Sequence, residues 1–305
     1  MRLASLLFAL AGLSGCDAIK FNNWRLRHRF ARQGLVSHTA ELPSGRMHYY
    51  DGGSGAPLLL LHGFGFGAVE NWEKQGPAFA KHRRVIAPDF YWFGQSVPSG
   101  PCESVRAQAE AVVELLDALG LGRVDVVGAS FGGLIALHLA IGHPDRVGRL
   151  VLVDAAGVRP TRDELDRIGA GFGGQSRVED LLMPTDLAAL KQFLERVVYR
   201  TKPPLPDWVL RQVMRELSRN REAKARLCRA FSDELLDDAA LARVAARTLV
   251  IWGRNDPLLL LSMGERLAKA IRGAEMIVFE DAAHSAMLER PARFNQTVLR
   301  FLEQR

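Results

Sequence analysis

Residues 124–141 read VDVVGASFGGLIALHLAI, and this stretch decides the fold. The apolar run at 124–127 is typical of a buried strand, and 134–141 have the apolar pattern of a helix. Between them lies the motif GASFG at 128–132. A serine hydroxyl becomes a useful nucleophile when a sharp strand-to-helix turn exposes its oxygen, and that turn needs small residues two positions before and after the serine. The stretch therefore predicts that Ser130 is a nucleophile.

The chain on both sides of this motif alternates between short apolar runs and helical patterns. Runs that are apolar on both faces and separated by helices are typical of a parallel sheet covered on both sides. The predicted strands are 57–61, 85–87, 124–127, 150–153, 248–252 and 276–279, and the predicted helices include 104–119, 134–141 and 264–271. A hairpin over 35–42 and 46–51 precedes them. We therefore expect an α/β core formed by 35–157 and 237–305.

Residues 158–236 interrupt this alternation. They contain no clear strand pattern and are predicted to form several helices, which would be an inserted cap. Within 208–231 the apolar positions follow helical spacing, while seven basic residues face only Glu216 and Glu222. This charge pattern favours a solvated face over a pocket, with contact to membrane lipid as the other interpretation.

Three spaced motifs resemble those of the α/β-hydrolase family. His62-Gly63-Phe64-Gly65 follows one predicted strand, the segment 88–96 (PDFYWFGQS) follows the next, and the motif around Ser130 follows a third. The resemblance covers nearly all of residues 45–304. It implies the α/β-hydrolase fold, a mostly parallel sheet flanked by helices with an inserted helical cap, and a Ser-His-Asp acyl-enzyme mechanism.

A nucleophilic serine needs a histidine base, and the base needs a carboxylate that fixes its tautomer. The chain order serine, acid, histidine that accompanies this motif leaves His138, His143 and His284 as candidates. The first two lie on the helix after Ser130 or at its end, which carries their side chains away from the serine oxygen. His284 lies in the loop after the last predicted strand, where the family places its base, and is therefore the predicted base.

Two aspartates compete for the role of the acid. Asp256 stands after a predicted strand in the motif that the family usually shows, and Asp154 stands after the preceding strand, where some members carry the acid. Asp256 is preferred, and Asp154 remains the alternative. Two backbone N–H groups must also stabilise the oxyanion, each worth roughly 3–4 kcal/mol. Phe131, directly after the serine, supplies one, and the resemblance assigns the other to Phe64.

The expected activity is the hydrolysis of carboxylic esters, with lipid-derived esters favoured, as in an esterase, lipase or phospholipase. The rings of Phe64, Phe66 and Phe131 would wall an apolar pocket or pack under the cap. One alternative is a carbon–carbon bond hydrolase of ring-cleavage products, against which an export signal counts. The other is a non-catalytic lipoprotein that binds through the cleft. No motif indicates a metal or an organic cofactor.

The N-terminus has the pattern of an export signal. Arg2 precedes an uncharged run over 3–15, which is shorter than the roughly 20 residues of a spanning helix. The run ends in Leu-Ser-Gly before Cys16, which resembles a bacterial lipobox and implies a signal peptide over 1–15 and lipidation of Cys16. Asp17 behind it resembles the pattern associated with retention at the inner membrane. We therefore expect the bacterial cell envelope, at the periplasmic face of the inner membrane, with an uncleaved anchor as the alternative.

Net charge and cysteine content agree with that location. The 305 residues carry a net charge of +6 and are 48% hydrophobic, a balance that excludes a disordered protein. Five of the six positive charges lie in 20–32, so a basic nucleic-acid surface is not indicated. The basic segment 16–34 is expected to contact membrane lipid. Besides Cys16, the chain has Cys102 and Cys228, for which buried thiols are favoured over a disulfide. The oligomeric state is not predicted.

Overall fold

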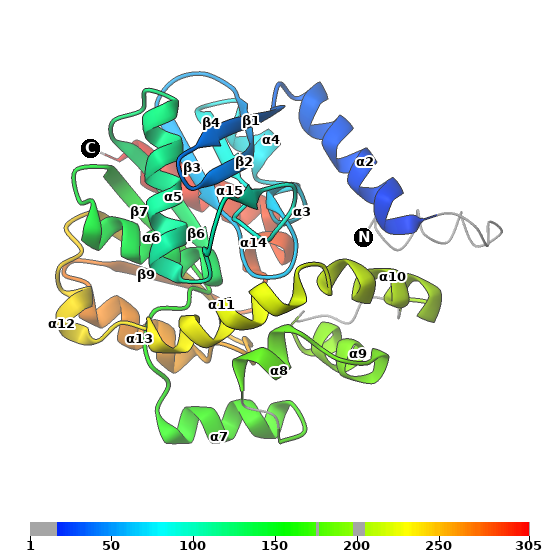
Figure 1. Cartoon of the computed structure of the whole chain (residues 1–305). Helices are drawn as coiled ribbons and strands as arrows, with labels where there is room; N and C mark the ends of the chain where they lie inside the picture. The colour runs from blue at the N-terminus through cyan, green and yellow to red at the C-terminus, as the bar shows by residue number, and fades with distance from the viewer. Residues whose placement is uncertain (1–16, 175–176, 198–204, 305) are drawn as a thin grey trace.

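A sheet of nine strands runs through the centre of the computed structural model, which describes residues 17–174, 177–197 and 205–304 (Figure 1). In spatial order its strands are β1 (Val36–Leu42), β2 (Gly45–Gly52), β4 (Arg84–Pro88), β3 (Pro57–Leu61), β6 (Val124–Ala129), β7 (Val147–Val153), β8 (Arg247–Gly253) and β9 (Glu275–Phe279), while the short β5 (Val97–Pro98) pairs with β2. The neighbours from β4 to β9 are parallel, and β2 is antiparallel to β1, β4 and β5. The α/β-hydrolase fold class expected from the sequence is therefore confirmed.

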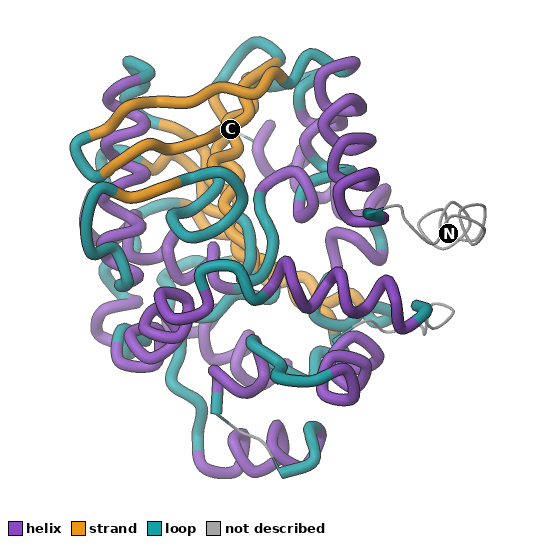
Figure 2. The backbone as a smooth tube through the Cα atoms, turned by 45° about the vertical axis from the view of Figure 1, so that its right-hand side comes forward, coloured by secondary structure: helices purple, strands orange, loops and turns teal. Residues whose placement is uncertain are grey.

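Helices cover both faces of this sheet (Figure 2). One face packs against α5 (Val105–Ala118), α6 (Phe131–Gly142), α12 (Asp238–Leu241) and α13 (Leu261–Ala270). The other packs against α2 (Ala18–Arg32), α3 (Ala68–Asn71), α4 (Gly76–Phe79), α14 (Ala286–Glu289) and α15 (Pro291–Glu303). Successive leucines of β3 enter opposite cores: Leu59 and Leu61 join the first, Leu58 and Leu60 the second. An unbroken apolar run is therefore the correct pattern for this strand.

Besides α12, five helices of the described residues lie between β7 and β8, and they cover one end of the sheet (Figures 1 and 2). They are α7 (Arg162–Gly171), α8 (Val178–Leu182), α9 (Leu187–Arg196), α10 (Asp207–Leu217) and α11 (Arg221–Asp233). The helical spacing over 208–231 does not form one helix. It breaks at Asn220, whose φ of 55° lies in the left-handed region, and whose side-chain amide donates to the Trp92 carbonyl at 3.1 Å. Asparagine tolerates this backbone better than most residues.

The basic N-terminal segment forms α2, which contacts both the core and the cap. Asp17 caps it by accepting from the Lys20 N–H, and Leu26 and Phe30 bury themselves against the core. At its other end Ala18 packs with Leu210 of α10. The predicted signal peptide and Cys16 lie outside the described residues. Among the described residues, no helix combines the length and apolar character needed to cross a membrane.

The two cysteines of the described chain are separate buried thiols. Cys102 and Cys228 are both free and are 4% and 0% exposed. The sequence prediction of buried thiols rather than a disulfide is confirmed.

Candidate active site

Ser130 sits in a strained turn between β6 and α6. Its φ of 51° and ψ of −118° are rare for a residue with a side chain. The turn holds because the Ser130 N–H donates to the Val153 carbonyl at 2.9 Å. A Cβ on Gly128 would lie 2.5 Å from the Gly132 carbonyl oxygen, and one on Gly132 would lie 2.3 Å from that of Leu61. Both glycines are therefore required by close backbone approach.

Ser130, His284 and Asp256 form a continuous hydrogen-bonded line. The Ser130 hydroxyl lies 3.0 Å from Nε2 of His284, and Nδ1 of His284 lies 2.7 Å from the Asp256 carboxylate. Because a carboxylate can only accept, Nδ1 carries the proton and Nε2 is free to accept from the serine. The other Asp256 oxygen accepts from the N–H groups of Leu258 and Leu259 at 2.9 and 3.0 Å. These contacts fix the orientation of both the carboxylate and the imidazole.

The three side chains come from loops that follow β6, β8 and β9, all at the carboxyl edge of the parallel sheet. This edge is where parallel α/β sheets place their ligand sites. The structure thus brings together Ser130, predicted from its motif, with His284 and Asp256, predicted from chain order together with the family resemblance. Its cap lies over the same end of the sheet (Figure 1).

Asp154, the alternative acid, is nearby but forms no hydrogen bond with the histidine ring. Its two carboxylate oxygens accept from the backbone N–H groups of Gly253, at 2.7 Å, and of Ala286, at 3.3 Å. Burial, and then the charge of Asp256, raise the pKa of Asp154 to about 8. It is therefore neutral at pH 7 and holds two loops together, whereas Asp256 is the carboxylate bonded to His284.

The environment of His284 keeps it basic. Burial alone would lower the pKa of His284, but the charge and hydrogen bond of Asp256 more than compensate, so that this pKa lies above its usual 6.5. A base with such a pKa accepts a proton readily near neutral pH.

The loop after β3 brings Gly63 and Phe64 beside Ser130. A Cβ on Gly63 would lie 3.4 Å from the Cβ of Ser130. The Gly63 N–H donates to the side chain of Asn71 at 3.2 Å. Phe131 is the first residue of α6, so its N–H has no partner within the helix. The predicted donors Phe64 and Phe131 thus lie on two segments that meet at the serine.

His62 positions this loop, a role that the sequence analysis missed. Its Nδ1 donates to the Gly63 carbonyl at 2.7 Å, and its Nε2 accepts from the Phe90 N–H at 3.0 Å. The ring is therefore neutral, in agreement with burial lowering its pKa. Its place directly before Gly63 in the motif was the available signal, because a buried histidine next to a functional loop often serves to orient it.

Aromatic rings pack behind the two predicted oxyanion donors. Phe64 lies 5.0 Å from Phe93 and 5.9 Å from Phe131 between ring centroids, and Phe231 of α11 closes the group at 6.1 Å from Phe131. Phe66 behaves differently, since it packs with the apolar cluster between α2, α9 and α10. Of the three rings expected to wall one pocket, two share a cluster and the third lies under the cap.

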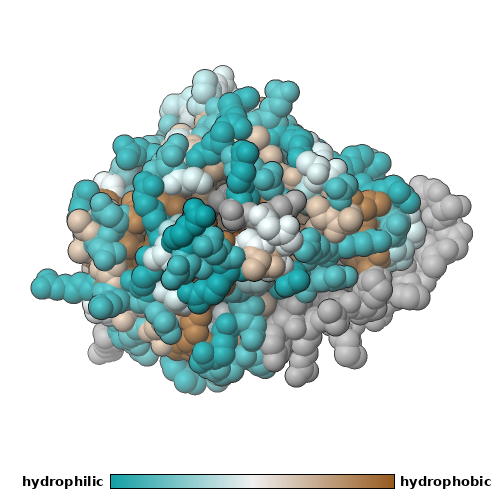
Figure 3. Space-filling model, turned by 90° about the horizontal axis from the view of Figure 1, so that it is seen from below, coloured by the Kyte–Doolittle hydropathy of each residue, from teal (hydrophilic) through white to brown (hydrophobic). Residues whose placement is uncertain are grey.

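A cavity of about 720 Å³ lies beside this cluster, and we call it the α2 cavity. It is bounded by α2, by the loops after β3 and β4, and by the junction of α10 and α11. Figure 3 shows the molecule from below the view of Figure 1. On this face the surface formed by the described residues is mostly hydrophilic and carries separate hydrophobic patches. No cluster of metal-ligating side chains occurs among the described residues.

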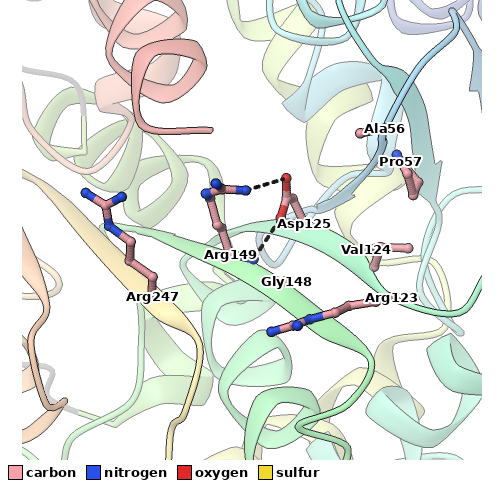
Figure 4. A pocket seen from close by; sticks show the side chains of 8 residues that line it. All are labelled: Ala56, Pro57, Arg123, Val124, Asp125, Gly148, Arg149 and Arg247. Carbon is pink, nitrogen blue, oxygen red and sulfur yellow. Dashed lines mark hydrogen bonds and ion pairs between the residues drawn. The ribbon is translucent and has the colours of Figure 1, made fainter. Parts of the chain in front are cut away.

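A second hollow, the amino-edge pocket, lies at the opposite edge of the sheet (Figure 4). It has a volume of about 520 Å³ and is lined by Ala56, Pro57, Arg123, Val124, Asp125, Gly148, Arg149 and Arg247. Arg149 and Arg247 occupy facing positions on β7 and β8. Asp125 accepts from the Arg149 N–H at 2.8 Å and also bonds the Arg83 guanidinium. Ser130, His284 and Asp256 are remote from this pocket.

Comparison with known proteins identifies relatives along most of the chain. The model of a family described as the alpha/beta hydrolase fold matches residues 56–291. The 2-hydroxymuconate semialdehyde hydrolase of Pseudomonas sp. (strain CF600) is 35% identical over 278 residues, covering 84% of this chain and 90% of that protein.

Two solved structures are also similar. One, titled a membrane phospholipase A and novel bacterial virulence factor, has a TM-score of 0.81 and 29% identity, covering 99% of this chain and 96% of that chain. The other is a meta-cleavage product hydrolase from Pseudomonas fluorescens IP01, with a TM-score of 0.75 and 26% identity, covering 88% and 97%.

The expected hydrolysis of carboxylic esters is contradicted by relatives whose names give other substrates. They are hydrolases of 2-hydroxymuconate semialdehyde and of related 2-hydroxy-6-oxo compounds, or meta-cleavage product hydrolases. 2-Hydroxymuconate semialdehyde contains no ester bond, so its hydrolysis must break a carbon–carbon bond. The alternative prediction, a carbon–carbon bond hydrolase of ring-cleavage products, is the better supported one. The motifs misled because a serine nucleophile attacks a carbonyl carbon whether an oxygen or a carbon atom leaves. The membrane-anchored esterase or lipase type is not confirmed.

Proposed function

The chain belongs to the α/β-hydrolase family, and on that premise we propose that it hydrolyses a carbon–carbon bond in 2-hydroxy-6-oxo-2,4-dienoates. The observation that carries the proposal is the line Ser130–His284–Asp256 in a chain that is 35% identical to a hydrolase of such a compound. The line supplies a nucleophile and a proton carrier. The relative supplies the substrate class.

The reaction adds the elements of one water molecule across the C5–C6 bond of the substrate. In 2-hydroxymuconate semialdehyde, transfer of the 2-hydroxyl proton to C5 gives a tautomer with a ketone at C2 and an aldehyde at C6, and the C6 carbonyl carbon is electrophilic. Breaking the C5–C6 bond then sends its electron pair through the C3–C4 double bond to the C2 oxygen. The products are 2-hydroxypenta-2,4-dienoate and formate, and their atoms equal those of the substrate and one water.

Ser130 performs the attack in this proposal. Its oxygen bonds to C6 as its proton passes to Nε2 of His284, 3.0 Å away. Negative charge then develops on the C6 oxygen, where the N–H groups of Phe64 and Phe131 stabilise it. Asp256 stabilises the imidazolium that forms.

His284 takes up and then releases a proton twice, once while the carbon–carbon bond breaks and once while the acyl group is hydrolysed. The imidazolium protonates the C2 oxygen of the departing dienolate, which leaves an acyl group on Ser130. Water next attacks the acyl carbon while His284 takes its proton, and the serine recovers its own as the acid departs. The proton of Ser130 and then the proton of the attacking water thus pass through Nε2 of His284, which is why the tautomer fixed by Asp256 matters.

The test measures loss of the conjugated chromophore of 2-hydroxymuconate semialdehyde by the purified full chain. We expect turnover in the wild type and a loss of at least about 10⁴-fold in Ser130→Ala, since removing a serine nucleophile has effects of that size or larger. His138→Gln is a matched control, because this histidine also follows Ser130 in the chain but bonds the Glu234 carbonyl.

Phospholipids and p-nitrophenyl esters from acetate to palmitate complete the test. Turnover of the dienoate that depends on Ser130 supports the proposal. Turnover of an ester that depends on Ser130, without any turnover of the dienoate, would overturn it while leaving the roles of the three residues intact.

We also propose that the N-terminal segment lies at a membrane surface in the bacterial envelope. Phe21 and Trp24 of α2 are 40% and 53% exposed and stack at 5.7 Å, and basic residues surround them. Exposed rings beside cations suit the headgroup region of a membrane. Cell fractionation of the wild type and of Cys16→Ala tests this location. A wild-type chain found outside the membrane fraction contradicts it.

A further inference from the structure

The loop over 63–67, which carries one of the two predicted oxyanion donors, is held at both ends. At its start the ring of His62 bonds the loop and also accepts from the Phe90 N–H at 3.0 Å. At its other end the Ala68 N–H donates to the Asp89 carboxylate at 2.7 Å. Because Asp89 and Phe90 are consecutive, both ends of the loop are tied to the same point directly after β4.

The Asp89 carboxylate is buried and is itself fixed from a second direction. Its side chain is 3% exposed, and its other oxygen accepts from the Gln95 N–H at 3.0 Å and from Nδ1 of His48 at 2.8 Å. Burial alone would raise the pKa of Asp89, but the hydrogen bond and charge of His48 lower it below its usual 3.8. The group is therefore a carboxylate at pH 7, and it accepts from all of these donors at once.

The chain at the end of the loop needs an acceptor from elsewhere. Ala68 is the first residue of α3, and the first N–H groups of a helix have no partner within it. The N-cap is Gly67, which has no side chain that could accept a hydrogen bond. A Cβ on Gly67 would lie 2.5 Å from an Asp89 carboxylate oxygen, so the backbone approaches the carboxylate closely. Asp89 thus sets where the loop ends.

Further contacts transmit this constraint to the middle of the loop. The Asn71 amide accepts from the Gly63 N–H at 3.2 Å and donates to the Gly67 carbonyl at 2.9 Å, which ties the two ends to each other. The Phe64 ring packs on Phe93, from the loop after β4, at 5.0 Å between centroids. A backbone donor that is fixed in advance stabilises an oxyanion without reorganising during the reaction.

We propose that Asp89 is a positioning residue that presets the Phe64 N–H for the oxyanion. It acts through the Ala68 N–H and the loop over 63–67, and takes no part in bond breaking. The inference rests on the proposed function, because that mechanism assigns the oxyanion to Phe64. An ester attacked by Ser130 would develop the same charge, so the inference can be tested on either substrate.

The first measurement is the steady-state kinetics of Asp89→Ala in the full chain. We expect kcat to fall about 10- to 100-fold while KM changes less than about threefold, because a displaced oxyanion donor weakens the transition state and not the bound substrate. The acidic limb of kcat/KM should stay at the pH of the wild type, since the proton path through His284 is unchanged. A merely structural defect would not separate kcat from KM in this way.

The affinity for trifluoroacetophenone, measured by calorimetry, is the second readout. Ser130 adds to the ketone carbon as its proton passes to His284, and the ketone oxygen becomes an oxyanion between Phe64 and Phe131. Ligands that resemble the transition state report on donors that substrates scarcely sense. The dissociation constant should therefore rise in Asp89→Ala by about the same factor as kcat falls.

Ser96→Ala is the matched control. Ser96 is 4% exposed, and its hydroxyl donates to the Asp89 carbonyl at 2.7 Å and accepts from the His48 N–H at 2.9 Å. The substitution removes two buried hydrogen bonds from the same loop, and neither of them reaches residues 63–67. We expect a lower urea midpoint with kcat and the ketone affinity close to those of the wild type.

Two results would overturn the inference. One is a wild-type kcat in folded Asp89→Ala. The other is an equal loss of kcat and ketone affinity in Ser96→Ala, which would indicate general loosening of the loop after β4. If Asp89→Ala does not fold, Gly67→Ala decides, because its Cβ pushes the end of the loop away from the carboxylate. A wild-type kcat in that variant would also exclude the proposed role.

A second substrate separates this inference from the proposed function. If the wild type does not cleave the dienoate, the proposed function fails, and the same variants are measured on p-nitrophenyl acetate and by ketone affinity, which requires no turnover. A selective loss in Asp89→Ala then still supports the positioning role. Cleavage of the dienoate at the wild-type rate by folded Asp89→Ala would exclude that role and leave the proposed function intact.

Discussion

The two edges of the parallel sheet both carry polar side chains beside a hollow, but they arrange their charges differently. At the carboxyl edge three side chains form a single hydrogen-bonded line, in which Ser130 bonds His284 and His284 bonds Asp256. At the amino edge the cations outnumber the acid, because Asp125 is bonded by Arg83 and approached by Arg149. The first arrangement defines a path for one proton. The second holds strands together.

The backbone explains why only one edge has such a path. At the end of β6 the chain turns sharply into α6, and the strained Ser130 lies there, half-buried, beside the first N–H groups of the helix. At the amino edge β7 and β8 pair in register, and the irregularity there is a register shift between β6 and β7 near Val124. Arg149 bonds the Gln304 carbonyl at 2.5 Å, and no described residue there is presented on a sharp turn into a helix. A pocket with charged walls is therefore not by itself a site for chemistry.

Substitution of the two aspartates at the carboxyl edge gives the largest expected effect. Asp256→Asn should lower kcat/KM by about 10⁴-fold, because an amide stabilises the wrong tautomer of His284. Asp154→Asn should lower it less than about tenfold, since Asp154 is neutral at pH 7 and the amide removes no charge. Steady-state kinetics on any substrate that Ser130 turns over make the comparison. Equal losses in both variants would show that the two acids act as a unit.

At the amino edge we expect a loss of stability and no loss of chemistry. Asp125→Asn leaves the largely buried Arg83 guanidinium without its ionic partner, which should lower the free energy of unfolding by about 3 kcal/mol. The shift of the urea midpoint measures this effect, and kcat/KM of the folded variant at 25 °C should match the wild type. A drop in kcat/KM without a shift of the midpoint would mean that the two edges are coupled.

The same contrast explains how much could be predicted from the sequence. The strands, the turn around Ser130 and the loop position of His284 follow from local patterns, and the structure reproduces them. The choice between Asp256 and Asp154 required three dimensions, because both follow strands and both are buried near His284. The orienting role of His62 depends on the Phe90 N–H, 28 residues further along the chain. The bond that is cleaved is decided by the leaving atom in the substrate, which no motif encodes.

The pH dependence of activity gives a smaller effect that tests the proton path directly. His284 must be neutral to accept the proton of Ser130, and Asp256 raises its pKa above 6.5. Activity should therefore fall about tenfold per pH unit as pH drops below that raised pKa, and should be retained above it. In Asp256→Asn the acidic limb of kcat/KM should move to lower pH. A limb at the same pH in both proteins would assign it to another group.

The smallest effect is expected for Arg247, which borders the amino-edge pocket. Its guanidinium bonds the Glu275 carboxylate at 2.9 Å, and the two side chains are 40% and 47% exposed. Solvent screens such a pair, so Arg247→Gln should change the free energy of unfolding by less than about 1 kcal/mol. Measured beside Asp125→Asn, it separates the two possible reasons for the arginines at this edge. If Arg247→Gln lowers the free energy of unfolding as much as Asp125→Asn, the arginines act as one network, and exposure to solvent does not weaken the ion pair of Arg247 with Glu275. If it costs little, the buried pair alone holds the strands, and Arg247 serves mainly to keep that end of the sheet charged.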